Sequence, residues 1–343
     1  MKQALFAVAF LFTFAACQQG SDGQNDNPLA GVDTTRIQTG GVQQITIDGK
    51  YHVWTKKVGD GAIKLLLLHG GPGFTHEYFE CFNAFLPRQG VTLYYYDQLG
   101  SAYSDQPEND SLWAIPRFVE EIEQVRRGLG LNRDNFTLLG HAWGGILAME
   151  YALKYQQNLK GLVISNMMAS YPAYGQYIGV LRSQMRKTLV DSLRAYEARQ
   201  AYKEPAYVDL VTNEFYTQHI LRRPINDWPE PVNRMFSRAN EQIYTLMQGP
   251  NEFSISGRLA NWDRMADLKR INVPTLVIGA KYDTMDPYYL AEMSRRLPQG
   301  RYLFCPNGGH LAMWDDQPTY FRGLINFLHD VQGDRPVAVA PAN

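Results

Sequence analysis

The sequence has no excess of either charge. Its 33 Lys and Arg residues nearly balance 34 Asp and Glu residues, which gives the 343-residue chain a formal net charge of -1. Nucleic acids and anionic lipid surfaces attract strongly basic proteins, so this balance favours neither as a partner. Cysteine is also scarce, with 3 in the chain, and no spacing of His and Cys resembles a metal site. The sequence therefore implies no metal and no other cofactor.

The N-terminal segment lacks an apolar run of the length that a membrane-spanning helix needs. The run at residues 4–16 is shorter than the roughly 20 apolar residues of a spanning helix. It follows a lysine, ends in small residues and precedes a polar stretch, which is typical of a secretory signal. We therefore predict a signal peptide at residues 1–16 and an exported protein.

Cys17 stands directly after this predicted signal. Residues 14–17 (FAAC) resemble a bacterial lipobox, in which the cysteine is lipidated and becomes the new N-terminus, although Phe14 replaces the usual Leu. Cleavage after Ala16 without a lipid is the alternative. The polar residues 17–35 are expected to form a flexible tether. The predicted location is the periplasm or outer membrane of a bacterium, with membrane contact only through the lipid anchor.

Two more cysteines, Cys81 and Cys305, lie in the rest of the chain. Export would place them in an oxidising compartment, where a disulfide can form. The sequence does not report the distance between them, so their pairing stays open.

Short apolar runs alternate with helical stretches over most of the chain, after a hairpin signal at residues 44–54. The apolar runs are at 63–68, 91–96, 136–139, 159–165, 273–278 and 302–304, and the helical stretches are at 76–86, 116–128, 144–156, 287–297 and 317–329. Continuous apolar runs are typical of strands that are buried on both faces. The pattern therefore predicts an α/β fold with a mainly parallel central sheet that is covered by helices.

The strand rhythm stops at residues 171–263, which are rich in Tyr, Arg, Gln and Met at helical spacing. We expect this segment to form an inserted helical cap, and residues 36–170 and 264–332 to form the core. The last residues, 333–343, carry Pro and Ala without a pattern and are expected to be disordered.

A glycine-rich loop, residues 69–73 (HGGPG), directly follows the first of these apolar runs. Glycines let the backbone pass close to a substrate and turn its N–H groups toward a developing oxyanion. A loop of this type after an early strand supplies one oxyanion amide in the α/β-hydrolase fold, and Gly71 is our candidate. A plain Gly/Pro turn is the alternative.

Residues 139–145 (LGHAWGG) have the frame of the G-x-S-x-G nucleophile elbow but lack its serine. Ala142 occupies the nucleophile position, and Trp143 would supply the second oxyanion amide. By itself this stretch would read as any turn between a strand and a helix. Its place in the order of the other motifs makes it an elbow.

In this fold the acid and the base follow the nucleophile along the chain. Asp283 comes just past the apolar run at 273–278, where open α/β sheets place their sites, and Asp286 is its rival. His310 ends the turn-rich stretch 306–310 (PNGGH) and could reach the elbow as general base, with the aspartate fixing its tautomer.

Together these motifs resemble the proline iminopeptidase (prolyl aminopeptidase) family of α/β-hydrolases. The resemblance rests on residues 69–73 (HGGPG), 94–101 (YYYDQLGS), 140–145 (GHAWGG) and 307–310 (NGGH), and it covers about residues 40–330. It implies an α/β-hydrolase fold with an inserted cap. The implied activity is release of an N-terminal residue, typically proline, from a peptide with a free N-terminus through an acyl-enzyme.

Residues 248–253 (QGPNEF) are similar to the branch that includes the tricorn-interacting aminopeptidases. The family recognises the free amino terminus with carboxylates from the cap, so the resemblance assigns this role to Glu252, and less directly to Glu214. Members of that branch often carry a second glutamate directly after the triad aspartate, where this chain has Thr284. A solvated helix face is the alternative for either glutamate.

Alanine cannot attack a carbonyl, and no other serine of the chain stands in an elbow. Loss of the nucleophile in serine proteases costs about 10⁶ in turnover. We therefore expect a serine aminopeptidase site whose hydrolysis is largely abolished. Two origins stay open, a serine replaced by design and a natural pseudoenzyme that binds peptide N-termini.

Overall fold

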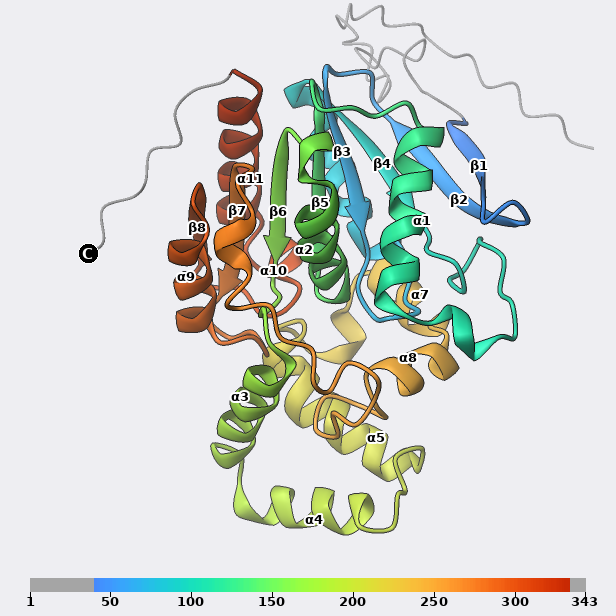
Figure 1. The fold of residues 1–343 in the computed structure, drawn as a ribbon. Coiled ribbons are helices and arrows are strands. Elements are labelled where there is room, and N and C mark those ends of the chain that lie inside the picture. Colours follow the sequence, from blue (N-terminus) through green and yellow to red (C-terminus); the bar gives the residue numbers. More distant parts are fainter. Residues whose placement is uncertain (1–39, 334–343) are drawn as a thin grey trace, which may run out of the picture. The chain divides into compact units, whose positions relative to one another are not determined.

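The computed structural model describes residues 40–333, and these form one unit built around an eight-stranded sheet (Figure 1). The strand order is β1-β2-β4-β3-β5-β6-β7-β8. The strands are β1 (Val42–Ile47), β2 (Tyr51–Val58), β3 (Ile63–Leu68), β4 (Val91–Tyr96), β5 (Phe136–His141), β6 (Gly161–Ser165), β7 (Thr275–Ala280) and β8 (Gly300–Cys305). The β1–β2 hairpin is antiparallel and joins β4 antiparallel, whereas all pairs from β4 to β8 are parallel. The predicted α/β fold with a mainly parallel sheet is confirmed.

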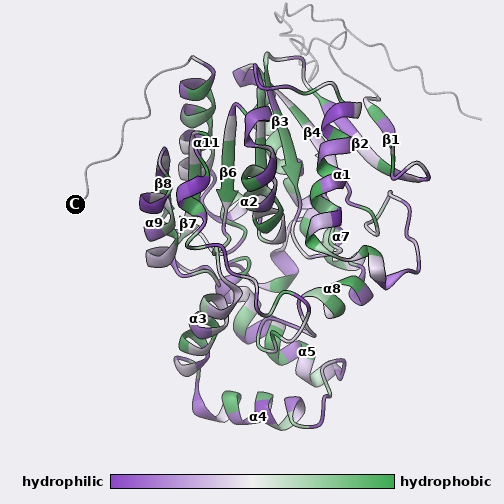
Figure 2. Ribbon diagram, in the orientation of Figure 1, coloured by the Kyte–Doolittle hydropathy of each residue, from purple (hydrophilic) through white to green (hydrophobic). Residues whose placement is uncertain are grey.

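Helices cover both faces of the sheet. Alternate side chains of β3 enter two different cores. Leu66 belongs to the core that includes side chains of α1 (Ile115–Gly128), α2 (Trp143–Tyr155) and α9 (Pro287–Arg296), whereas Leu65 belongs to the core that includes side chains of η2 (Glu77–Ala84) and α11 (Gln317–Gln332). Figure 2 shows β3 and β6 as apolar strands between these layers. This double burial explains why the inner strands are continuous apolar runs in the sequence.

A helical segment connects β6 to β7. Its helices are α3 (Tyr171–Ser183), α4 (Lys187–Glu197), α5 (Pro205–Val211), α6 (Thr217–His219), α7 (Glu230–Ser237) and α8 (Glu241–Met247), with a π-helical turn, η6 (Thr212–Tyr216), between α5 and α6. An isolated bridge between Ser170 and Asp263 brings the start and the end of this segment together. The segment, called the cap below, lies beyond the ends of β6 and the neighbouring parallel strands (Figure 1).

The observed bounds differ from the predicted ones by up to three residues, and one of these differences lies at the elbow. β5 continues to His141, past the predicted end at residue 139, because Gly140 and His141 still pair with β6. This extension carries the sheet directly into position 142. Within residues 40–333, no helix is long and apolar enough to cross a membrane.

Several predictions concern residues that the structure does not describe. The signal peptide, lipidated Cys17 and the tether lie outside the described residues, as does the tail from residue 334 onward. Cys81 and Cys305 are described, and both are buried free thiols.

Candidate active site

The elbow places Ala142 at a sharp turn between β5 and α2. Its backbone has φ 50° and ψ -123°, a left-handed conformation that is rare and costly for a residue with a Cβ. Two glycines make the turn sterically feasible, since a Cβ on Gly140 would lie 2.0 Å from the carbonyl oxygen of Gly144, and one on Gly144 would lie 2.1 Å from that of Leu68. The Cβ of Ala142 lines the pocket that lies under the cap.

The predicted acid and base are hydrogen-bonded to each other. Asp283 follows β7 and is fully buried, and its Oδ1 lies 2.8 Å from Nδ1 of His310. Asn166 donates its side-chain amide to Oδ2 of Asp283 at 2.7 Å, and the backbone N–H of Met285 donates to Oδ1 at 3.1 Å. These donors orient the carboxylate toward His310. With Nδ1 facing Asp283, the other ring nitrogen of His310 stays available to a group at position 142.

Asp286, the rival for the acid, has a different role. Its carboxylate accepts the backbone N–H of Tyr288 at 2.9 Å and caps the N-terminus of α9. The structure therefore places Asp283, and not Asp286, beside the histidine.

The predicted oxyanion donors, Gly71 and Trp143, line the same pocket as Ala142. Gly71 has φ 111°, and a Cβ there would lie 2.6 Å from the backbone nitrogen of Phe74. Trp143 is the first residue of α2, where backbone N–H groups have no partner within the helix. Gln98 joins the two segments, because its side chain accepts the indole N–H of Trp143 at 2.8 Å and donates to the carbonyl of His69 at 3.1 Å.

Glu252 reaches the same pocket from the cap, between α8 and β7. The hydroxyl of Tyr216 donates to its Oε2 at 2.5 Å, and that of Tyr244 donates to Oε1 at 2.9 Å. Burial first, and then the negative charge of Glu252, hold the pKa of both tyrosines well above the usual range. Their hydroxyls therefore stay protonated and fix the carboxylate without neutralising it.

The structure does not bring Glu214 to this pocket. It lies in η6 with an exposed side chain that pairs with Arg186 at 3.1 Å. In this turn the pocket-facing residue is Tyr216. The assignment of amine recognition to Glu214 is thus corrected to a surface ion pair.

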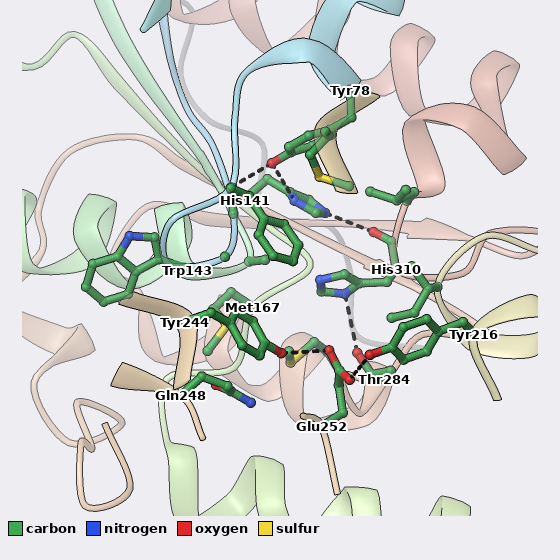
Figure 3. Close-up of a pocket in the computed structure, with 18 of the residues that line it drawn as sticks. Tyr78, His141, Trp143, Met167, Tyr216, Tyr244, Gln248, Glu252, Thr284 and His310 are labelled. Carbon is green, nitrogen blue, oxygen red and sulfur yellow. Dashed lines mark hydrogen bonds between the residues drawn. The ribbon is translucent and has the colours of Figure 1, made fainter. Parts of the chain in front are cut away.

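The pocket combines these polar groups, and the further polar side chains of Gln248 and Thr284, with a mainly apolar and aromatic lining (Figure 3). It encloses about 650 Å³, including the open space at its mouth. Apolar and aromatic side chains on its wall are Phe74, Tyr78, Met167, Tyr171, Tyr174, Ile220, Met235, Phe236, Met285 and Leu311. Among residues 40–333, no group of three or more His, Cys, Asp and Glu side chains could hold a metal ion.

The sequence analysis missed Tyr78, Asn166, Tyr216 and Tyr244. Asn166 could have been identified, since it directly follows β6 at the carboxyl edge of a parallel sheet. The tyrosines carried no such signal, because their roles depend on how η2 and the cap helices pack.

A hydrogen-bonded acid–base pair, an elbow between strand and helix, and a glycine-rich loop that lines the same pocket are the features of an α/β-hydrolase site, and they lie on a matching fold. The family model for the alpha/beta hydrolase fold matches residues 64–317. Curated relatives identify the family within this superfamily. The proline iminopeptidase of Flavobacterium johnsoniae is 55% identical over 84% of this chain and 97% of its own length. That of Saccharolobus solfataricus is 36% identical over 78% of this chain and 85% of its own.

A solved structure agrees with these relatives. The crystal structure of a proline iminopeptidase from Mycobacterium smegmatis superposes with a TM-score of 0.78 at 27% identity, covering 85% of this chain and 99% of the other. The chain belongs to the proline iminopeptidase family of the α/β-hydrolase superfamily.

Proposed function

We propose that this pocket binds the N-terminal residue of a peptide, with the free amine at Glu252 and the scissile carbonyl at position 142. The observation that carries the proposal is that Glu252, His310, Ala142 and Trp143 all line one pocket. A cationic amine that leaves water needs a negative partner, and Glu252 presents one with its orientation fixed by two hydroxyls.

The first residue of the peptide would place its side chain against the apolar wall. Proline suits this wall, because its ring is apolar and its secondary amine brings the positive charge close to the scissile carbonyl. The names of the relatives support proline as the preferred residue.

With a hydroxyl at position 142, the remaining groups would perform acyl transfer. His310 would take the hydroxyl proton as the oxygen attacks, Asp283 would stabilise the resulting imidazolium, and the amides of Gly71 and Trp143 would bind the oxyanion. His310 would then protonate the leaving amine and activate water to release the acyl group. The chain has Ala142 instead, so the acyl-enzyme cannot form. We propose that it binds peptide N-termini and hydrolyses them at about 10⁻⁶ of the rate of a serine form.

Ala142→Ser tests this proposal in the full chain with prolyl-7-amido-4-methylcoumarin as substrate. The serine form is expected to release the fluorophore at ordinary enzyme rates, whereas the chain with Ala142 should not. The chain with Ala142 should still bind L-prolinamide, measured by calorimetry, and bind the neutral analogue cyclopentanecarboxamide far more weakly.

A second function shares the same binding mode. Because position 142 is the one catalytic position without its expected group, a non-catalytic receptor for peptide N-termini is the alternative. Prolinamide binding in both forms without any turnover by Ala142→Ser would favour this receptor. Absence of both binding and turnover would remove the family-based function altogether.

The N-terminal segment supports a proposal on location. We propose export through a signal peptide and attachment to a membrane by a lipid on Cys17, on the basis of residues 1–17. Labelled palmitate should enter the protein in a bacterial host but not its Cys17→Ala variant. Equal labelling of the two, or none of either, would contradict lipidation at this residue.

A further inference from the structure

A chain of buried hydrogen bonds runs beside the active site without taking part in the proposed chemistry. The hydroxyl of Tyr78 lies 2.8 Å from the backbone nitrogen of Gly70 and 2.9 Å from Nδ1 of His141. The other ring nitrogen of His141, Nε2, lies 2.9 Å from the backbone carbonyl oxygen of His310. Figure 3 shows these bonds as a continuous path. Tyr78 and His141 are 1% and 2% exposed.

The chemistry of the partners fixes the direction of every bond in this path. A carbonyl can only accept, so Nε2 of His141 carries a proton and donates to His310. Burial, and then the neighbouring His310, hold the pKa of His141 well below its usual value, so the ring is neutral and Nδ1 is an acceptor. The hydroxyl of Tyr78 therefore donates to Nδ1, and its oxygen accepts the N–H of Gly70. Every donor in this path therefore has an acceptor, and the direction of each hydrogen bond is determined.

The path joins the three segments that must meet for catalysis. Gly70 precedes the oxyanion donor Gly71, His141 precedes position 142, and His310 is the predicted base. His310 is also held from its other side, because its backbone N–H donates to the carbonyl of His219 at 2.7 Å. The path ends at a backbone carbonyl, so it cannot carry a proton to or from the reacting atoms. Its contribution is to position.

We propose that Tyr78 and His141 are positioning residues that hold the loop of Gly70 and Gly71 against the elbow and the His310 loop. The amide of Gly71 is thereby kept at the distance where an oxyanion forms. In its catalytic consequence this inference rests on the proposed aminopeptidase activity.

Loss of this positioning should lower kcat with little effect on KM. Oxyanion contacts strengthen in the transition state, whereas Glu252 binds the amine equally in both states. Removal of a whole oxyanion donor costs about 10²–10³ in kcat. A displaced donor costs less, so we expect Tyr78→Phe in the Ala142→Ser chain to lower kcat by about 10- to 100-fold, with KM changed by less than about twofold.

Tyr95→Phe is the matched control. Tyr95 is equally buried and does not line the pocket, and its hydroxyl lies 2.8 Å from Oδ1 of Asn83 and 3.3 Å from the carbonyl oxygen of Phe79. The two variants remove the same atom from similar surroundings, so a general loss of packing would affect both. An unchanged kcat in Tyr78→Phe, or an equal loss in Tyr95→Phe, would overturn the proposal.

Substitutions of His141 distinguish a role in hydrogen bonding from a role in packing alone. Gln can donate to the carbonyl of His310 and accept from Tyr78, whereas Leu can do neither. We expect His141→Gln to retain most of the kcat that His141→Leu loses. Equal kcat values for the two would overturn the proposal.

A second readout does not depend on turnover. The chain with Ala142 is labelled with nitrogen-15 in its histidines and measured by NMR. The signals that disappear in His141→Gln belong to His141. We expect them to show a neutral ring that is protonated at Nε2. Protonation at Nδ1 or at both nitrogens would overturn the inference. If the Ala142→Ser chain is inactive, the proposed function fails, and this measurement still decides whether the path of hydrogen bonds exists.

Discussion

Glu252→Gln is the most informative change, because it removes the charge of the proposed amine site and leaves its shape. In the Ala142→Ser chain the hydroxyls of Tyr216 and Tyr244 hold the carboxylate but leave its charge in place. Gln keeps the volume, but its single side-chain oxygen replaces the two carboxylate oxygens that now accept from the tyrosines, and its NH₂ group cannot accept from the substrate amine.

The magnitude follows from the kind of bond lost. A hydrogen bond between charged groups contributes about 1.5–3 kcal/mol, and each 1.4 kcal/mol is about tenfold in affinity. Glu252 is only partly buried, which favours the lower part of that range. KM for prolyl-7-amido-4-methylcoumarin should therefore rise about 10- to 40-fold. The amine keeps its charge throughout the reaction, so kcat should change by less than about threefold.

Two comparisons make this prediction specific. The cyclopentanecarbonyl analogue has the ring of proline without the amine, so its kcat/KM should be the same with Glu252 and with Gln at that position. Glu214→Gln removes a carboxylate of the same cap that pairs with Arg186 at the surface, and it should leave KM unchanged. A rise in KM of less than about twofold for Glu252→Gln, or an equal rise for Glu214→Gln, would refute the assignment of the amine site.

Three further predictions concern the acid, the elbow and the response to pH. In the Ala142→Ser chain, Asp283→Asn should lower kcat by about 10⁴-fold because His310 loses the partner that fixes its tautomer. Asp286→Asn should retain activity because asparagine also caps a helix. Equal losses of kcat in the two variants would contradict the assignment of the acid. Ala142→Gly should raise the free energy of unfolding by about 1 kcal/mol in urea titrations, because glycine tolerates the φ of 50°. Ala148→Gly, inside α2, should instead lower it by about 1 kcal/mol, and a destabilised Ala142→Gly would argue against strain at the elbow. Burial lowers the pKa of His69 from 6.5 to about 4. Between these pH values the unfolded chain therefore binds more protons than the folded chain. The free energy of unfolding should fall by up to about 3 kcal/mol as the pH falls through this window. A free energy of unfolding that is constant across the window would contradict the burial of a neutral His69.

The sequence predicted those parts of the site that depend on chain order. Asp283 and His310 could be found because each follows a strand of the parallel sheet, and such strands all end at the same edge. Gly140 and Gly144 could be found because a tight turn admits no Cβ at those positions. The fold could be predicted from the apolar runs, because strands that are buried on both faces are continuously apolar in the sequence.

The parts that depend on helix packing could not be predicted. Glu214 and Tyr216 are two residues apart in a π-helical turn, and only the packing of that turn decides which of them faces the pocket. Tyr78 lies in a 3-10 helix and contacts His141 across 63 positions of sequence. No periodicity in the chain reports such a contact.

The strained turn at position 142 is set by the clearance of its neighbouring glycines and not by the residue that it presents. The turn therefore persists without a side-chain oxygen, and a single atom separates this chain from the triad that we propose. Any short side chain placed there should be delivered to the same point of the pocket. With Ala142→Cys, a thiol-reactive prolyl compound could be attached covalently in the pocket. A structure of this adduct would show the contacts of the prolyl group with the cap.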